Sequence, residues 1–396
     1  MRLGSANLFD RALQNLYTRQ TDLASQQEKL TSGKNVNRAS DDPTGVAQAE
    51  RALTRITRIA SDQRALDLQR NAVSLAESSL GDATGLVQRL RELVVSAGNG
   101  GYTAANRNSI AQEISGLRDQ LLALANSTDT NGIPLFGGLG SASAPFTDTA
   151  TGVVFNGIPG QQAAGTDSVP SAMDGQAVWM NVATGNGTFN TSLGAANTGT
   201  AWTETGQVVT PGLVTGDTYS ITFSVAGGLT TYSVVNTTSG ATVATAQPYK
   251  AGQAITFDGL AITAHGAPAQ GDTLTITPST TTNLFKVIDD AITGIGSSTT
   301  NNKVSQAVTL ALAQIDTGMV HLQAARSQAG EWLNRADNIQ NAQEGRSVQL
   351  AADKSRAEEL DMVKGISDFT RLQTGYQAAL QSYAQVQKLS LFNYIN

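Results

Sequence analysis

The sequence predicts a mainly α-helical protein with an inserted β domain, in which long heptad helices from both termini form a coiled coil or helical bundle. Two observations carry this prediction. Apolar residues recur with helical spacing over residues 1–138 and again over 283–396. Between these blocks the helical periodicity disappears, and Thr, Gly, Ala, Ser and Asn dominate a stretch of short alternating segments.

Residues 1–42 are predicted to form an N-terminal core helix that ends near Ser32-Gly33. Leucine and glutamine share one seam, with spacings of three and four residues: Leu13, Leu16, Gln20, Leu23, Gln27 and Leu30. Polar residues at seam positions weaken a coiled coil but help to fix its register and partner number. We therefore expect this seam to contact other subunits.

Residues 43–138 are predicted to form the N-terminal part of a helical bundle. Asp41 and Asp42 precede Pro43, and this pattern is typical of a helix cap rather than of a metal or acid–base pair. A heptad row then follows without a gap: Ile59, Leu66, Val73, Leu80, Val87 and Val94. After the glycine turn at 98–101 a third helix is predicted, so the two helices should form an antiparallel hairpin.

Residues 139–282 are predicted to be an inserted, β-rich outer domain. Segments 218–225 and 231–235 alternate in polarity around Gly227-Gly228, which predicts a β-hairpin, and 272–277 reads as a further strand. Because no helical seam continues through this block, we expect a short linker to be able to replace residues 140–280. His265 is interpreted as a loop residue.

Helical periodicity returns in residues 283–358, the predicted C-terminal part of the bundle, and in 359–396, a C-terminal core helix. The last segment resembles the first, because glutamines again interrupt its seam. Its predicted subunit contacts are made by large apolar and aromatic side chains: Phe369, Tyr376, Leu380, Tyr383, Leu389, Leu391 and Phe392.

Composition excludes several function classes. The chain has no cysteine and only two histidines, so thiolate nucleophiles, disulfides and His-rich or Cys-ligated metal sites are excluded. Residues 119–282 carry one basic and nine acidic side chains, and no block has the concentrated basic face of a nucleic-acid binder. Arg51, Arg55 and Arg58 are interpreted as a solvated or helix-packing face. We predict no catalytic residues, metal, cofactor or membrane insertion, and no cleaved signal peptide.

Residues 30–43, Leu-Thr-Ser-Gly-Lys-Asn-Val-Asn-Arg-Ala-Ser-Asp-Asp-Pro, resemble the signature near the start of flagellins and their relatives. Within that superfamily the sequence most resembles the hook-associated protein 3 family. Pro43 follows the Asp-Asp pair, 131–138 reads Asn-Gly-Ile-Pro-Leu-Phe-Gly-Gly, and 389–395 reads Leu-Ser-Leu-Phe-Asn-Tyr-Ile. The signature residues are Ser32, Gly33, Asp41, Asp42 and Pro43. The resemblance covers about 1–138 and 283–396.

The resemblance implies a non-enzymatic protein that polymerises as a junction ring between hook and filament. Its implied partners are further copies of itself, another hook-associated protein on the hook side, flagellin on the filament side and a flagellar export chaperone. It also implies secretion through the flagellar type III apparatus. Two alternatives are open: a flagellin-type filament subunit, and a wall-acting enzyme carried on the middle domain. The second would need a carboxylate pair in a cleft, whereas the acidic residues of that block are scattered.

Overall fold

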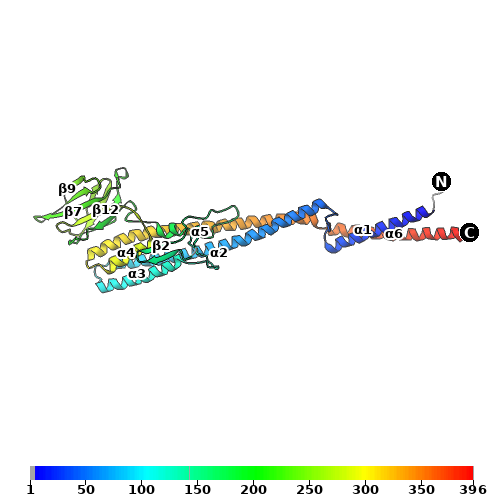
Figure 1. The fold of residues 1–396 in the computed structure, drawn as a ribbon, viewed down its shortest axis with the longest axis horizontal. Coiled ribbons are helices and arrows are strands. Elements are labelled where there is room, and N and C mark those ends of the chain that lie inside the picture. Colours follow the sequence, from blue (N-terminus) through cyan, green and yellow to red (C-terminus); the bar gives the residue numbers. More distant parts are fainter. Residues whose placement is uncertain (1–4, 142, 396) are drawn as a thin grey trace. The chain divides into compact units, whose positions relative to one another are not determined.

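The computed structural model describes the backbone of residues 5–141 and 143–395, and side chains at 10–141, 143–385 and 387. The chain divides into two compact units. Unit 1 comprises Met1–Arg64 with Ile339–Asn396, and unit 2 comprises Ala65–Asn338. Long helices from both ends of the chain flank a β-rich middle region, as Figure 1 shows, so the predicted fold class is confirmed.

Six α-helices are present in the described part of the chain, together with two short helical segments. The α-helices are α1 (Ser5–Ser32), α2 (Pro43–Ala97), α3 (Ala104–Ala125), α4 (Leu284–Gly296), α5 (Asn301–Glu358) and α6 (Met362–Ile395). The short segments are η1 (Gln176–Met180) and η2 (Pro211–Leu213). No break occurs in α2 at the glycines near residue 81, so the apolar heptad row runs along a single helix.

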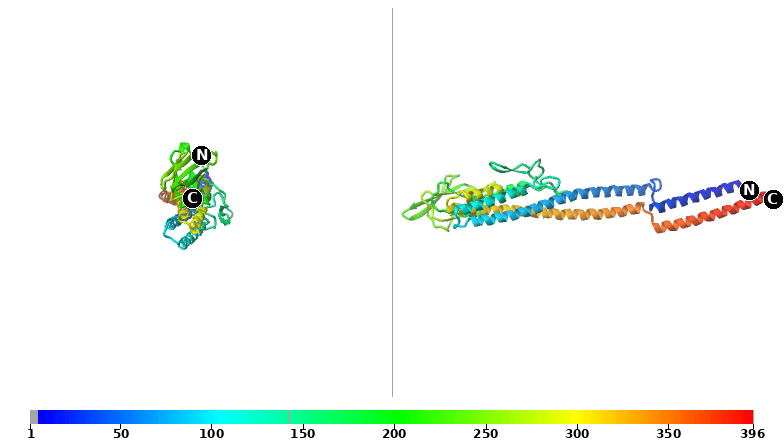
Figure 2. Two further views of the ribbon diagram at one scale, coloured as in Figure 1. Left: turned by 90° about the vertical axis from the view of Figure 1, so that its left-hand side faces the viewer. Right: turned by 90° about the horizontal axis from the view of Figure 1, so that it is seen from below.

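The core of the bundle in unit 2 follows the predicted heptad rows. Leu80, Val87 and Val94 are fully buried on α2, and Ile315 and Leu322 are buried on α5. Helix α3 packs against α4, and both lie alongside the unit 2 portions of α2 and α5 (Figure 2). Burial of these apolar rows is the main stabilising contribution, because each fully buried aliphatic side chain is worth about 1.5–3 kcal/mol.

Thirteen strands lie between α3 and α4 in the described residues. They are β1 (Phe146–Thr149), β2 (Gly152–Phe155), β3 (Val182–Ala183), β4 (Phe189–Leu193), β5 (Trp202–Thr203), β6 (Gln207–Val208), β7 (Tyr219–Ala226), β8 (Leu229–Asn236), β9 (Thr242–Pro248), β10 (Ala254–Phe257), β11 (Leu260–His265), β12 (Thr273–Pro278) and β13 (Thr281–Thr282). All of the pairings between them are antiparallel.

Two sheets enclose the core of the β-rich region. One has five strands in the order β4-β12-β7-β8-β9, and the other joins β10, β11 and β5, with β6 paired to β11. Alternate side chains such as Ile221, Phe223 and Ile276 are buried between them. The predicted hairpin is confirmed, because Ala226 pairs with Leu229 around the two glycines. The strand predicted at 272–277 is β12.

His265 is a strand residue rather than the loop residue that the sequence predicted. It ends β11, where its backbone pairs with Trp202 of β5. Its ring stacks on the Trp202 indole at a centroid distance of 4.6 Å, and its Nε2 lies 2.9 Å from Oε1 of Glu204.

The chain enters and leaves the β-rich region at one place. Strand β3 pairs with β13, and the amide of Thr184 donates to the carbonyl oxygen of Thr280 at 2.9 Å. The region is also attached to α5, because the buried Gln306 accepts a hydrogen bond of 2.8 Å from the amide of Thr203. The β-rich region is therefore attached to the helices by hydrogen bonds as well as by the chain connections.

Residues before β3 belong to the packing of the helices. Phe136, Trp179 and Phe285 are fully buried, and Trp179 stacks on Phe285 of α4 at 5.9 Å. Phe146 of β1 joins them at 6.1 Å from Phe285. The aromatic cluster thus places the segment before β3 against the bundle. The predicted division at residue 139 stays a proposal, and these contacts favour a boundary near β3.

Candidate assembly surface

The two ends of the chain pack on each other in unit 1. Helices α1 and α6 lie side by side and run antiparallel (Figure 1), with Leu30 beside Gly365 and Arg19 beside Gly375. The absence of a side chain at these glycines lets the backbones approach closely. The side-chain Nε2 of Gln26 donates a hydrogen bond to the backbone carbonyl oxygen of Gly365 at 3.0 Å. This polar contact fixes the register of the two helices.

The predicted N-terminal seam divides between the two faces of α1. Leu13, Leu16, Leu23 and Leu30 are half-buried, whereas Gln20 and Gln27 are exposed. The glutamine that donates a hydrogen bond to α6 is Gln26, which is not a member of the predicted seam. Since the two exposed glutamines face solvent in the single chain, their contact with other subunits stays a prediction.

The predicted C-terminal seam is partly turned toward α1. Phe369, Tyr376 and Tyr383 are half-buried, and Leu380 is 43% exposed. Leu389, Leu391 and Phe392 lie outside the residues whose side chains the structure describes. Near the start of α6, Met362, Val363 and Ile366 are 47%, 82% and 55% exposed. Large apolar side chains gathered at this exposure are typical of a protein interaction surface.

A short backbone contact joins the chain where the helices at both ends are interrupted. We call residues 33–36 and 358–360 the clasp. The backbone amide of Asn35 donates to the carbonyl oxygen of Glu358 at 2.8 Å. The backbone amide of Leu360 donates to the carbonyl oxygen of Gly33 at 2.9 Å. Lys34 and Glu359 form an isolated antiparallel bridge between them. Gly33 has φ of 69°, a conformation that favours glycine.

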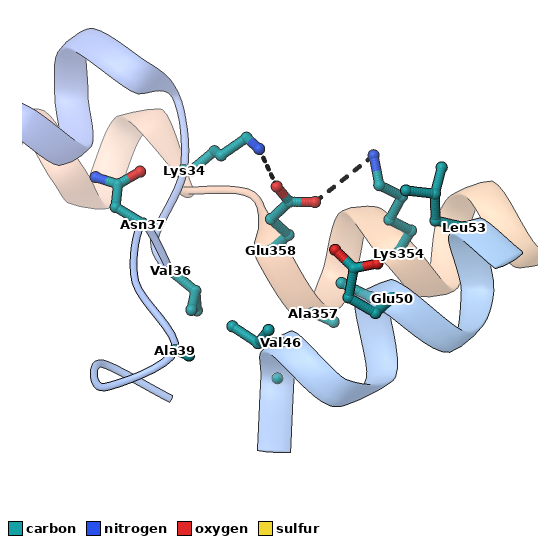
Figure 3. A pocket seen from close by; sticks show the side chains of 12 residues that line it. Lys34, Val36, Asn37, Ala39, Val46, Glu50, Leu53, Lys354, Ala357 and Glu358 are labelled. Atoms are coloured by element: carbon teal, nitrogen blue, oxygen red, sulfur yellow. Dashed lines mark ion pairs between the residues drawn. The ribbon is translucent and has the colours of Figure 1, made fainter. Parts of the chain in front are cut away.

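An ion-pair cluster covers the clasp. Figure 3 shows the carboxylate of Glu358 between the ammonium groups of Lys34 and Lys354, with Lys354 at 3.6 Å. The Glu358 side chain is 17% exposed. The hydrogen bond from Lys34 holds the pKa of Glu358 below its ordinary value, against the opposing effect of burial, and both lysine charges act in the same direction.

The ion pairs border a small pocket of about 290 Å³. Apolar side chains such as Val36, Val46 and Ala357 line it, and Glu50 and Leu53 flank it (Figure 3). Leu53 is 42% exposed and Val36 is buried. The pocket therefore combines small apolar side chains with charged groups at its edge.

The signature residues perform local structural tasks. Asp42 caps α2, because its Oδ1 accepts hydrogen bonds of 3.0 Å from the amides of Thr44 and Gly45. These bonds, with that from the Thr44 hydroxyl, lower the pKa of Asp42. Oδ2 of Asp41 accepts from the amide of Arg38 at 3.0 Å. Pro43 is the first residue of α2, as the capping pattern predicted.

The hydroxyl of Ser32 organises the turn that leads into the clasp. It donates to Oδ1 of Asn37 at 2.9 Å and accepts from the amide of Lys34 at 3.2 Å. Gly33 lies directly beside it in the clasp. Together with the cap at Asp42, these contacts make the signature a folded connector between α1 and α2.

The described residues contain no group of three or more His, Asp and Glu side chains placed to hold a metal ion. Within the same residues, no helix is long and apolar enough to cross a membrane. Glu204 pairs with His265 and not with a second carboxylate.

Sequence reasoning missed the residues that join the two ends of the chain. Lys34, Glu358 and Gln26 carried no pattern of their own, because their partners lie at the other end of the sequence. Gly365 and Gly375 inside a predicted helix were the available signal, since an interior helical glycine often marks a close backbone approach. Gln343, 3% exposed on α5 with Oε1 unpaired in the described residues, was also unforeseen.

Family models match both ends of the chain. Residues 7–141 match the bacterial flagellin N-terminal helical region, and residues 312–395 match the bacterial flagellin C-terminal helical region. Flagellar hook-associated protein 3 of Escherichia coli is 24% identical over 99% of both chains. The protein of the same name from Salmonella typhimurium is 35% identical over 43% of this chain, and the match spans 53% of that relative.

A solved structure extends the similarity to three dimensions. The crystal structure of Xanthomonas campestris FlgL superimposes with a TM-score of 0.70 at 30% identity. The match covers 78% of this chain and 99% of the Xanthomonas chain.

Proposed function

The chain belongs to the hook-associated protein 3 family of the flagellin superfamily, and from this premise we propose that it is a structural protein of the bacterial flagellum that polymerises as a ring joining hook to filament. The similarity along nearly the whole length of a junction protein is the observation that supports this most. The paired terminal helices with exposed apolar residues agree with it, because a subunit of a tube must bury such residues against its neighbours.

The partners follow from this position in the organelle. We propose contacts with copies of the same chain, with another hook-associated protein on the hook side and with flagellin on the filament side. An export chaperone would cover the apolar C-terminal segment before assembly. The proposed route out of the cell is the flagellar type III apparatus. A chain without cysteine or disulfide suits export in an unfolded state.

We also propose that the protein has no enzymatic activity. The family is structural, and the acidic residues described in the middle region do not form a catalytic pair. Asp217 accepts a hydrogen bond from Asn236, Asp258 from Tyr219, and Asp272 from backbone amides. Each carboxylate is used to hold a turn or a strand end.

The test uses a host strain that lacks its own junction protein and receives this chain. The wild-type chain should restore filaments, and the variant Leu391→Asp with Phe392→Ser should not, so flagellin monomers should accumulate in the medium. A matched control places the same changes on exposed residues of the β7–β8 hairpin, Leu229→Asp with Val225→Ser, and should assemble normally. Normal filaments on the tail variant would contradict the proposal that this segment belongs to the assembly core.

A further inference from the structure

A basic groove runs along one side of the α2–α5 pair in unit 1. Its volume is about 390 Å³, and its charged lining consists of Arg51, Arg55, Arg356 and Asp353. The apolar floor includes Leu350, which is buried. Arg51 and Arg55 are one helical turn apart, so both guanidinium groups project along the same side of α2.

The positive charge of this groove is not neutralised within the described chain. The carboxylate of Asp353 already accepts hydrogen bonds from Arg356 and, at 3.2 Å, from Gln349. Arg51 and Arg55 are exposed and form no ion pair with any described residue. Guanidinium groups held close together without a counter-charge repel one another, and they bind carboxylates well because their planar donors match a carboxylate's oxygens.

Arginine continues along this side of the helix beyond the groove. Arg58 follows Arg55 by three residues, is exposed and has no ion-pair partner among the described residues. Asp62 follows one turn later and does not line the groove. The groove therefore keeps a net positive charge, with an apolar floor that a hydrated inorganic anion would not fill.

A second groove, in unit 2, has the opposite charge. It has a volume of about 460 Å³ and lies between the segment around η1 and α5. Asp174 and Glu331 contribute its carboxylates, beside His321, and no lysine or arginine is among its described lining residues. The amides of Gln176 and Ala177 donate to Oδ1 of Asp174 at 3.0 and 3.4 Å, which fixes the orientation of that carboxylate.

We propose that the basic groove of one copy of the chain binds the acidic groove of a second copy. The inference rests on the proposed function, because it supplies a contact for the polymerisation. The two grooves are different surfaces of one polypeptide, so the contact is heterologous and can repeat from copy to copy into a ring. Complementary charge fixes which surfaces meet and in which register.

A second copy fits the basic groove better than a nucleic acid does. The chain carries a formal net charge of −6, which does not favour a nucleic acid as its partner. A nucleic-acid site needs basic residues over an extended face. The neighbouring copy in an assembly supplies the carboxylates of Asp174 and Glu331 at high local concentration.

Charge reversal tests the pairing in the junction-deficient host. The variants are Arg51→Glu with Arg55→Glu, Asp174→Lys with Glu331→Lys, and the fourfold swap that combines them. Like charges facing each other should lower the number of filament-bearing cells by about tenfold or more in each double variant. The swap should recover most of that loss. Arg64→Glu with Lys303→Glu changes two exposed, unpaired basic residues outside both grooves and should assemble normally.

Cross-linking identifies the occupant of the groove. Because the chain has no cysteine, Gln48→Cys with Gln328→Cys supplies the only thiols of this protein, one at the lining of each groove, and leaves every charged group in place. Isolated hook–filament particles treated with a short bifunctional thiol reagent should give a dimer of this chain, linked between the two engineered positions. A product with another axial protein, or a fourfold swap that assembles no better than its parents, would overturn the proposal.

The outcomes separate this contact from the function it serves. If all reversed variants assemble as the wild type does, the pairing of the grooves is wrong while the junction role stands. If the wild-type chain itself fails to restore filaments, the proposed function is wrong. Circular dichroism of each purified variant, with unchanged helix content and unfolding temperature, shows that a loss of assembly is not a loss of folding.

Discussion

The backbone amide of Asn35 donates a hydrogen bond of 2.8 Å to the carbonyl oxygen of Glu358, and this bond joins the two ends of the chain at the point where their helices are interrupted. Helix α1 ends at Ser32 and α5 ends at Glu358, so both interruptions meet in the clasp. A backbone contact between two connectors sets the register of the helices that follow them. The side chains of Lys34 and Glu358 strengthen the contact from outside.

Glu358→Gln should loosen the clasp without unfolding the bundle. The substitution keeps the shape of the side chain but removes the charge that holds Lys34 and Lys354. Because the Lys34 side chain is half exposed, we expect a coupling of about 0.5–1 kcal/mol between positions 34 and 358 in a double-mutant cycle with Lys34→Met. Hydrogen exchange at the Asn35 amide should quicken, while exchange in α3 stays unchanged. Equal effects in both places would contradict a local role.

The clasp should weaken in acid. Since Lys34 lowers the pKa of Glu358 in the folded chain, the pair stabilises the fold fully above the unfolded pKa of about 4.3. The contribution is lost as the pH falls through the folded pKa. Urea unfolding of the wild type and Glu358→Gln should therefore differ at pH 7 and converge near pH 3. Comparing the two proteins cancels the acid sensitivity of Asp42 and Asp148, whose pKa values are also lowered.

Arg118→Ala should destabilise unit 2. The Arg118 side chain is 8% exposed and donates to Asp148 at 3.0 Å and to Asp289 at 3.0 Å, so it ties β1 to α4 across α3. Its loss leaves the carboxylates of Asp148 and Asp289 without the cation they share, at an expected cost of about 1–3 kcal/mol in the free energy of unfolding. Arg89→Ala breaks only exposed pairs, with Glu92 of α2 and Glu113 of α3, and should leave the unfolding temperature nearly unchanged. Similar losses in both variants would contradict a special role for Arg118.

Much of the fold could be predicted because it depends on local patterns. The row from Ile59 to Val94 is buried as its heptad spacing implied, and the glycines at 227–228 form the turn of a hairpin. Periodicity was less informative for α1. A seam counted in threes and fours singled out Gln27 for contact with other subunits, and it did not indicate that Gln26 would donate to Gly365 of α6. That choice depends on the partner helix, which one segment of sequence does not specify.

The candidate surfaces were harder to predict than the helices. Lys34 meets Glu358 because two connectors from opposite ends of the chain cross, and no spacing within either segment indicates that pairing. The arginines at 51, 55 and 58 were visible as a stripe but were interpreted as a solvated face. They are exposed in the structure, and the proposal of a binding groove depends on α5 beside them, where Asp353 is paired with Arg356. Whether a charged side chain has a partner of opposite charge depends on the residues that the fold brings beside it.

The β-rich region should be removable, but at limits narrower than 140–280. The amide of Thr280 donates to Oγ1 of Thr184 at 2.9 Å, so a short Gly/Ser linker can replace residues 185–279 without separating the ends. We expect this deletion to keep the helices and to remain soluble, because Gln306 and Asn302 of α5 would exchange their partners in the β region for water.

Replacing 140–280 should instead damage the bundle. That deletion removes Phe146 and Trp179, which pack on Phe285 of α4, and it also removes Asp148, the partner of Arg118. Loss of a buried aromatic side chain costs about 3–5 kcal/mol, so the longer deletion should lose a large part of the stability of unit 2. Circular dichroism and thermal unfolding of both deletions decide the matter. If the two retain equal helix content and unfolding temperature, the segment before β3 does not belong to the core of the bundle.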